Sequence, residues 1–508
     1  MPLSLRAGRA RALAVTFGFC CASSVAGDVR IDHVTIVSAE RISPRRDASV
    51  YIQGDRIKAI YRSKPSRLAR AGNSVETIDG RGLYLSPGLI DSHVHTGGVP
   101  GMGRAQERTH PEIARAAREQ VPRSYLYFGF TTLIDLISTP ETIAQWNSRD
   151  VHPDIYFCGG APVVDGYPMN FESKADRYQE YPYLVVQRGE ESTAPKGVDP
   201  ATHTPEAVVA RMKADGAICV KSFFDRGVGG GEGLPVPGLD TMRALVRAAH
   251  AAKMPVLLHA RGSEAQTFAL DSGVDIIAHG LWDWNSEPQA VSDITSGISK
   301  ILDRVVETQL GWQPTMQVMY GFRDLFDPDY LSGPQVGRVY PSSMIAWFRS
   351  PEGQWFHDII APQVLSKTLL ESGDVAAQWD AVRSTYVVPI TRDRNATQYL
   401  SKHKARLLFG TDTPAVPTYA NPPGLNGWLE MHRLCEAGLT PAQVFRAATL
   451  SNAQALGLDR QIGTVQVGKR ANLLLSRENP AETIEAYDGI LKVILRGRVL
   501  DRKELAAN

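Results

Sequence analysis

Polar and apolar residues alternate near both ends of the chain. Short runs of this kind lie between residues 29 and 77, around the turn Gly54-Asp55, and again from Ile462 onward. Such alternation is typical of strands with one buried face, and the intervening glycines mark turns. The first segment is too small to form a robust domain alone. We therefore expect residues 28–82 and 461–508 to meet in one small β-sandwich domain built from both chain termini.

Between these ends the pattern changes to short apolar runs that are each followed by helical spacing. The eight runs occupy residues 83–91, 131–136, 154–159, 217–224, 255–260, 275–280, 312–316 and 406–412. Residues 239–253 carry apolar side chains at three- and four-residue steps, and Thr440 and Pro441 are typical of a helix start. Eight strand–helix units predict an α/β fold, a (β/α)8 TIM barrel over residues 83–460. The chemistry of such a barrel lies at the carboxyl ends of its strands.

Two connections are too long to be simple loops of this barrel. They run over about residues 159–204 and about residues 316–399, and the second is rich in aromatic residues. Long ordered insertions on the catalytic face usually form lids or substrate walls. An oligomer contact or a separate helical hairpin would explain them equally well, so a homo-oligomer stays open.

The first 27 residues have the order of a secretory signal peptide. Arg6, Arg9 and Arg11 precede a short apolar run, and small residues follow it. The apolar run is shorter than a membrane span needs. We expect cleavage after Ala26 or Gly27 and an exported protein, periplasmic or secreted, without membrane attachment. A membrane anchor or a buried segment is the alternative.

The charge balance and the cysteine content limit the kinds of binding partner and the disulfides that we expect. The 55 basic residues nearly balance the 54 acidic residues, and the absence of a basic tract argues against nucleic acid and acidic membrane surfaces as partners. Signal removal would leave Cys158, Cys219 and Cys435, an odd and scattered set that is no disulfide framework. We expect these three residues to be buried thiols.

Two histidines follow directly after the first of the eight runs. Side chains at i and i+2 of an extended strand point the same way, so His93 and His95 can reach one ion together. Neutral imidazole is the commonest protein ligand for zinc-type metals. Two histidines alone do not make a metal site, because polar residues also end strands simply to reach solvent.

Other runs carry further residues of ligand type at or near their ends. These are Lys221 in the fourth run, His259 in the fifth, His279 in the sixth and Asp412 in the eighth. Each has an ordinary explanation alone, as a structural histidine, an exposed lysine or an aspartate that caps a turn. In a barrel, however, all of them would converge over one mouth, which predicts a metal site.

These residues also carry a resemblance to a known family. The stretches SPGLIDSHVHT, AICVKSF, VLLHARG, DSGVDIIAHG and LLFGTDT resemble those of the amidohydrolase superfamily, in particular its imidazolonepropionase-like and prolidase-like members. The resemblance implies a binuclear centre of two divalent metal ions, usually Zn²⁺. One ion would be held by His93, His95 and Asp412, and the other by His259 and His279.

The resemblance further implies how this centre acts. Lys221 would bridge the ions as N6-carboxylysine, because a protonated lysine cannot bind a cation. Two cations would lower the pKa of a bridging water, so that hydroxide attacks the polarised substrate carbonyl. Asp412 would take the proton of this hydroxide and pass it to the leaving amine.

Some positions depart from the pattern of relatives. Arg261 stands where relatives often have histidine, and it would be able to hold a substrate carboxylate bidentately. A solvated loop arginine is the alternative. Ala278 and Asn472 stand where relatives usually have Glu and Asp, and we expect both to lie outside the ligand set.

The expected reaction is hydrolysis of an amide or peptide-like C–N bond in a small molecule, such as a dipeptide or an N-acyl amino acid. Cyclic amide, lactone or phosphotriester hydrolysis on the same site stays open. A mononuclear deaminase fits less well, because Gly262 occupies the place where such relatives carry a glutamate, and because Lys221 is present. A non-catalytic scaffold of the same fold also fits less well, because none of the ligand residues is missing.

Overall fold

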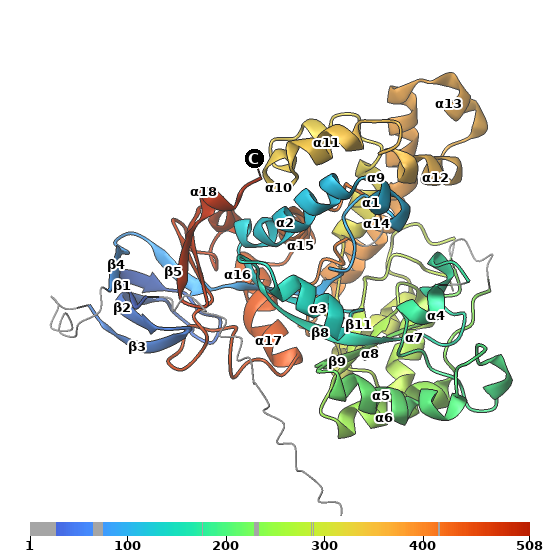
Figure 1. Cartoon of the computed structure of the whole chain (residues 1–508), viewed down its shortest axis with the longest axis horizontal. Coiled ribbons are helices and arrows are strands. Elements are labelled where there is room, and N and C mark those ends of the chain that lie inside the picture. Colours follow the sequence, from blue (N-terminus) through green and yellow to red (C-terminus); the bar gives the residue numbers. More distant parts are fainter. Residues whose placement is uncertain are drawn as a thin grey trace, which may run out of the picture.

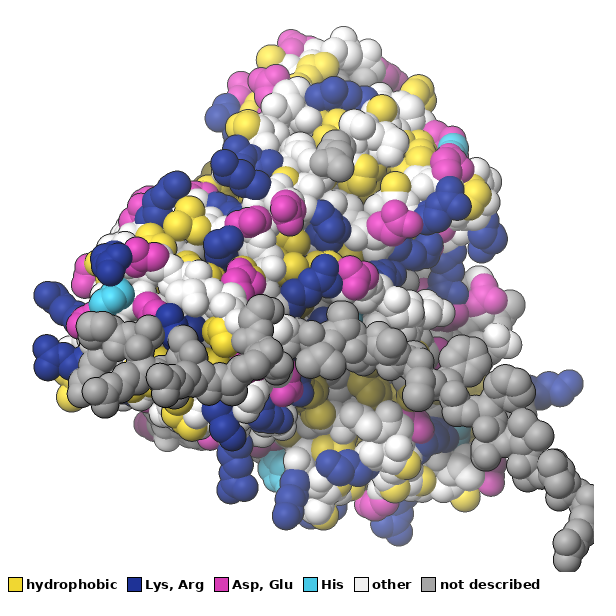
Figure 2. All heavy atoms as spheres, turned by 60° about the vertical axis from the view of Figure 1, so that its left-hand side comes forward, with side chains coloured by type: hydrophobic (Ala, Val, Ile, Leu, Met, Phe, Trp, Pro, Cys, Tyr) yellow, Lys and Arg dark blue, Asp and Glu magenta, His cyan; other side chains and the backbone are white. Residues whose placement is uncertain are grey.

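The structure of the protein is a computed structural model that describes residues 27–63, 75–174, 176–227, 233–285, 287, 289–414 and 417–507. The expected signal peptide therefore lies, apart from Gly27, outside the described residues. Within these ranges every helix is too short or too polar to span a bilayer. Basic and acidic side chains are interspersed on the face in Figure 2.

Strands from both ends of the chain build one eight-stranded sheet. They are β1 (Val29–Ile36), β2 (Arg45–Gln53), β3 (Arg56–Arg62), β4 (Glu76–Asp79), β5 (Tyr84–Pro87), β13 (Leu473–Ser476), β14 (Ile490–Leu495) and β15 (Arg498–Asp501). Leu473 of β13 lies opposite Pro87 of β5 in an antiparallel pair, which joins the two ends (Figure 1). Ile31, Val50 and Ile494 belong to its buried core. The predicted meeting of the termini is thus confirmed, while a two-layered sandwich stays a prediction.

Seven parallel strands form the second sheet, and each corresponds to one of the first seven predicted runs. They are β6 (Leu89–Val94), β7 (Phe130–Asp135), β8 (Asp154–Ala161), β9 (Cys219–Phe223), β10 (Val256–His259), β11 (Ile276–Ala278) and β12 (Gly311–Gln313), side by side in chain order. Because all seven strands are parallel, their carboxyl ends lie along the same edge of the sheet.

The eighth predicted strand is not a continuous strand in the structure. Leu407 forms an isolated parallel bridge with Trp312 of β12, and Thr413 forms another with Val94 of β6. Asp412 lies beside the second bridge with a φ of 57°, which is outside the range of a β-strand and interrupts the ladder. The segment 406–413 thus contacts both edge strands of a curled parallel sheet.

Helices alternate with these strands as predicted. They are α1 (Arg104–Thr109), α2 (Pro111–Tyr127), α3 (Pro140–Asn147), α5 (Pro205–Ala214), α6 (Leu239–Ala251), α7 (Ser263–Ser272) and α8 (Ser296–Thr308), while α15 (Leu425–Glu436), α16 (Pro441–Arg446) and α17 (Asn452–Ala455) follow segment 406–413. The last helix, α18 (Arg502–Leu505), follows β15 of the first sheet. Met242, Leu245 and Ala249 form part of the buried face of α6, at the helical spacing that predicted it. Thr440 caps α16 and exchanges hydrogen bonds with Gln443 in a capping box.

Both long insertions contain helices, most of them short. The first holds α4 (Arg177–Glu180) and three single 3₁₀ turns, and the second holds α9 (Gln317–Asp324), α10 (Val336–Val339), α11 (Ser342–Phe348), α12 (Trp355–Val364), α13 (Lys367–Ser372) and α14 (Val375–Lys402). The Trp355 indole N–H donates to the Gly101 carbonyl at 3.0 Å. The second insertion therefore contacts the loop that follows His95 (Figure 1). Its role as a lid or substrate wall stays a prediction.

Two of the three expected thiols are joined in a disulfide. Cys158 of β8 and Cys219 of β9 lie opposite each other in neighbouring strands, with Cα atoms 4.4 Å apart, and both are fully buried. The expectation of three thiols was wrong because parallel pairing places these distant cysteines in register, which their spacing in the sequence does not reveal. Cys435 is free and partly buried.

A buried carboxylate connects the two sheets. Asp154, at the start of β8, pairs with Arg470 and Arg496 at 2.8 Å each and accepts a hydrogen bond from the Asn472 amide at 2.7 Å. The Asn472 side-chain oxygen in turn accepts from the Arg496 backbone N–H at 2.8 Å. Asn472 therefore lies where the two sheets meet, and both its amide N–H and its amide oxygen form hydrogen bonds there.

Candidate metal centre

His93 and His95, at the carboxyl end of β6, both contact Asp412. The Nδ1–H group of the buried His93 donates to Gln313 Oε1 at 3.2 Å, and His93 Nε2 lies 3.0 Å from Asp412 Oδ1. His95 is a quarter exposed, and its Nε2 lies 2.9 Å from the same oxygen. Gln313 also donates to Ser92 Oγ at 2.7 Å, which fixes the orientation of the amide. The two imidazoles thus meet at one carboxylate.

His259 and His279 extend this cluster of imidazoles. The ring centroid of His279 lies 4.9 Å from that of His93 and 4.3 Å from that of His259. His279 Nδ1 lies 3.2 Å from Thr315 Oγ1 and 3.7 Å from Asp412 Oδ2. The four histidines and Asp412 therefore form one continuous group at the carboxyl edge of the sheet.

Two residues of this group and the neighbouring Thr315 have positive φ angles. The values are 82° for His279, 48° for Thr315 and 57° for Asp412. Such a backbone conformation costs on the order of 1–3 kcal/mol for a residue with a side chain, and it persists mainly at functional sites. Gly410 brings the chain close as well, since a Cβ there would lie 2.8 Å from His93 Cβ. The local backbone is thus held in place around these side chains.

Burial sets the protonation of the cluster. It lowers the pKa of His93 to about 3 and also lowers the pKa values of His259 and His279, against the opposing charges of Asp412 and Asp225. Burial alone would raise the pKa of Asp412, but His93 and His279 outweigh it and hold that pKa well below its usual range. Neutral imidazoles and an ionised carboxylate are the forms that bind divalent metals.

Lys221 lies in β9 with its ammonium group buried. Its Nζ has no hydrogen-bond partner among the described residues. Burial lowers the pKa of Lys221 to about 7, although the Asp412 charge opposes this shift. A lysine that is partly neutral near pH 7 is able to react with carbon dioxide, as the predicted carboxylation requires.

The residues present fit a divalent cation. Ligand atoms of His93, His279 and Asp412 lie within 4.8 Å of one another. Although His93 Nε2 is close to Asp412, the two groups are not aligned as a hydrogen bond, so this buried nitrogen has no hydrogen-bond partner in the described part of the chain. A buried polar atom without a partner is costly unless an ion or water completes it.

Arg261, which was predicted to bind substrate, pairs with a carboxylate of the protein. Its Nε lies 2.7 Å and its Nη2 3.2 Å from the oxygens of Asp225, which is itself 2.9 Å from His259 Nε2. One edge of the guanidinium is therefore already occupied, and the substrate role stays a prediction.

Several residues around the cluster were missed from the sequence. Tyr167 packs its ring 4.4 Å from that of His259, and Trp282 packs 5.6 Å from His279. Both come from loops whose course the hydrophobic pattern does not predict. Asp225 directly follows the predicted strand 217–224, so its position at the carboxyl edge of the sheet was an available signal. Gln313 ends β12 but lies near the start of the predicted run 312–316, so no such signal was available for it.

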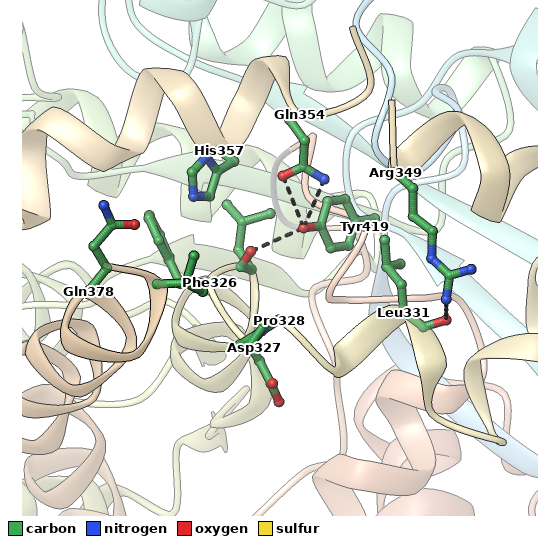
Figure 3. Close-up of a pocket in the computed structure, with 11 residues that line it drawn as sticks. Phe326, Asp327, Pro328, Leu331, Arg349, Gln354, His357, Gln378 and Tyr419 are labelled. Atoms are coloured by element: carbon green, nitrogen blue, oxygen red, sulfur yellow. Dashed lines mark hydrogen bonds between the residues drawn. The ribbon is translucent and has the colours of Figure 1, made fainter. Parts of the chain in front are cut away.

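A cavity of about 330 Å³ lies between the second insertion and Tyr419, and no histidine of the cluster lines it (Figure 3). Its lining includes Phe326, Arg349, His357 and Tyr419, and none of the six predicted ligands is among its lining residues. The Tyr419 hydroxyl there donates to the Leu325 carbonyl at 3.1 Å. This cavity is therefore separate from the candidate centre.

Solved structures share the whole architecture. An Xaa-Pro dipeptidase with bound methionine matches with a TM-score of 0.62 and 21% identity, over 93% of this chain and 100% of that chain. The A. niger ochratoxinase matches with a TM-score of 0.63 and 18% identity, over 94% of this chain and 96% of that chain. At such identities these matches show the fold alone.

Sequence comparisons add a family and a short local match. Guanine deaminase of Rattus norvegicus is 39% identical over 80 residues, which are 15% of this chain and only 18% of that protein. The sequence model of the amidohydrolase family matches residues 84–282 and 376–500, more than half of the 508 residues. The chain belongs to the amidohydrolase family.

Proposed function

We propose that the protein is a metal-dependent hydrolase that cleaves an amide or peptide-like C–N bond in a small molecule such as a dipeptide or an N-acyl amino acid. The observation that carries this proposal is the buried cluster in which His93, His95 and His279 surround Asp412. Membership of the amidohydrolase family and the likeness to a dipeptidase support the type of bond. The matching fold also supports a complete (β/α)8 barrel, with segment 406–413 as its eighth element.

The ligands would divide between two ions. His93, His95 and Asp412 would hold one divalent ion, and His259 and His279 the other, with zinc as the expected metal. Lys221 would join them after its neutral Nζ forms a bond to the carbon of carbon dioxide and releases a proton. When bound, such ions lower the pKa of a water molecule and polarise the scissile carbonyl.

Asp412 would move the proton in this reaction. Its carboxylate is ionised and lies within 3 Å of two imidazoles, so it is able to accept the proton that water loses on adding to the carbonyl carbon. Delivery of this proton to the substrate nitrogen lets the C–N bond break with a neutral amine as leaving group. The buried histidines stay neutral and do not compete for the proton.

The compartment is part of the proposal. The sequence of residues 1–27 predicts export, and the buried disulfide between Cys158 and Cys219 supports it, because such bonds form and persist in oxidising compartments. A periplasmic or secreted enzyme with a small-molecule substrate fits both observations.

Amine release from a library of dipeptides and N-acyl amino acids tests the reaction. We expect metal-loaded protein to release amine from a subset of the library, as measured by mass spectrometry, and the Asp412→Asn variant to release none. Equal release by the variant would contradict the role of Asp412. A protein that binds metal but hydrolyses only lactones or phosphotriesters would contradict the proposed bond type.

A further inference from the structure

We propose that Asp225 is a positioning residue that orients His259 for metal binding, and that Arg261 acts by holding Asp225 and not by binding the substrate carboxylate. The inference rests on the proposed metal centre and concerns residues outside its ligand set. It assigns a role to Asp225, which the sequence pattern did not single out, and replaces the role first expected of Arg261.

Asp225 accepts hydrogen bonds on both of its carboxylate oxygens. It lies just beyond β9, four residues after Lys221, and its side chain is only 5% exposed. Oδ2 lies 2.9 Å from His259 Nε2 and 2.7 Å from Arg261 Nε. Oδ1 lies 3.2 Å from Arg261 Nη2 and 2.9 Å from the Gly227 backbone nitrogen. Four donors thus fix this carboxylate in one orientation.

The contact with Asp225 determines which nitrogen of His259 is able to bind a metal. A carboxylate accepts only from a protonated ring nitrogen, so Nε2 carries the hydrogen and Nδ1 carries the free lone pair. An anionic partner also makes the ring a stronger ligand. Tyr167 packs against the face of the same ring, with centroids 4.4 Å apart and an interplanar angle of 31°. His259 is therefore held both at its edge and on its face.

Arg261 holds Asp225 in this buried position through two hydrogen bonds, one from Nε and one from Nη2. Arg261 Nη2 also donates to the Gly227 carbonyl at 3.1 Å. The Nε and Nη2 groups form one of the guanidinium edges that are able to hold a carboxylate bidentately, and Asp225 already occupies this edge.

The binding of Co²⁺ tests the positioning role of Asp225 and Arg261 without depending on catalytic turnover. We would compare wild type with Asp225→Ala, Asp225→Asn, Arg261→Met and the double variant Asp225→Ala/Arg261→Met. The readouts are the dissociation constant for Co²⁺, measured in competition with a chelator, and the visible absorption of the bound Co²⁺. Arg226→Met is the matched control, because Arg226 lies over the ring of Phe224 and pairs with Glu264 in an ion pair in which both side chains are about half exposed.

We expect Asp225→Ala to weaken Co²⁺ binding by about 10- to 100-fold and to change the absorption spectrum, since the partner of a metal-binding histidine typically contributes this much. Asp225→Asn should lose less, because its amide oxygen still accepts from Nε2–H. Arg261→Met should weaken binding in wild type and add nothing in the Asp225→Ala background. Arg226→Met should bind as wild type does.

Two results would overturn the inference. One is unchanged Co²⁺ affinity and absorption in both Asp225 variants. The other is an Arg261→Met variant with normal Co²⁺ affinity and a raised KM for a dipeptide but not for its C-terminal amide, which would assign Arg261 to the substrate carboxylate. If Asp225→Ala does not fold, the near-isosteric Asp225→Asn and Arg261→Met decide the matter. Failure of wild type to bind Co²⁺ would instead contradict the proposed function itself.

Discussion

Removal of the disulfide between β8 and β9 should destabilise the protein strongly. The bond joins Cys158 to Cys219 across 61 residues, and in the chain-entropy account closing such a loop removes roughly 14 cal/mol/K from the unfolded chain, or about 4 kcal/mol at 25 °C. Both sulfurs are fully buried, so their replacement by alanine also loses packing. A Cys158→Ala/Cys219→Ala variant should therefore lose about 4 kcal/mol or more in free energy of unfolding.

Urea unfolding followed by tryptophan fluorescence measures this loss. Cys435→Ala is the control, because it removes the free thiol and leaves the disulfide intact. Alkylation in denaturant gives an independent count: the mature chain should react at one thiol before reduction and at three after it. Three reactive thiols without reduction, or an unfolding free energy equal to that of wild type, would refute the reasoning.

Three further predictions follow from buried polar groups. Gln313→Met should weaken metal binding by about 10-fold or more, because His93 loses the hydrogen-bond partner that fixes its ring. Competition with a chelator measures the affinity, and an unchanged value would contradict this prediction. Asn472→Asp should lower the free energy of unfolding by about 2 kcal/mol at pH 8 and by less at pH 4. The reason is that a carboxylate would then face Asp154 where the Asn472 amide now donates a hydrogen bond. Equal urea midpoints for the variant and wild type would contradict this prediction. Burial raises the pKa of Glu430 to about 8. Between about pH 4.5 and pH 8 the folded protein therefore keeps a proton that the unfolded chain has released. The free energy of unfolding should fall as the pH rises through this range. Glu430→Gln should reduce this decline, and parallel pH profiles for both proteins would exclude Glu430 as its cause.

The strand pattern carried most of the predicted architecture because parallel buried strands are short and apolar on both faces. Seven of the eight runs are strands in the structure, and the histidines at their ends lie together. The run 406–412 differs because the left-handed backbone of Asp412 interrupts the ladder while still directing its carboxylate to His93 and His95.

The sequence pattern did not predict contacts between residues that are distant in the chain. The pairing of Cys158 with Cys219 depends on strand register, which composition and spacing do not reveal. The contact between Asp225 and Arg261 joins residues that follow two neighbouring strands, and it is the basis of the positioning role proposed for Arg261. Hydrophobic periodicity predicts helices and strands, whereas pairings between their side chains are determined only when the helices and strands pack together.

Metal stoichiometry of the purified mature protein tests the central claim most directly. Elemental analysis of wild type beside Asp412→Asn and the control Arg226→Met would count divalent ions per chain. The account predicts two ions per chain in wild type and in the control, and fewer in Asp412→Asn, because that aspartate contacts three of the histidines. Wild-type protein that holds no divalent ion after incubation with zinc and bicarbonate would contradict the account.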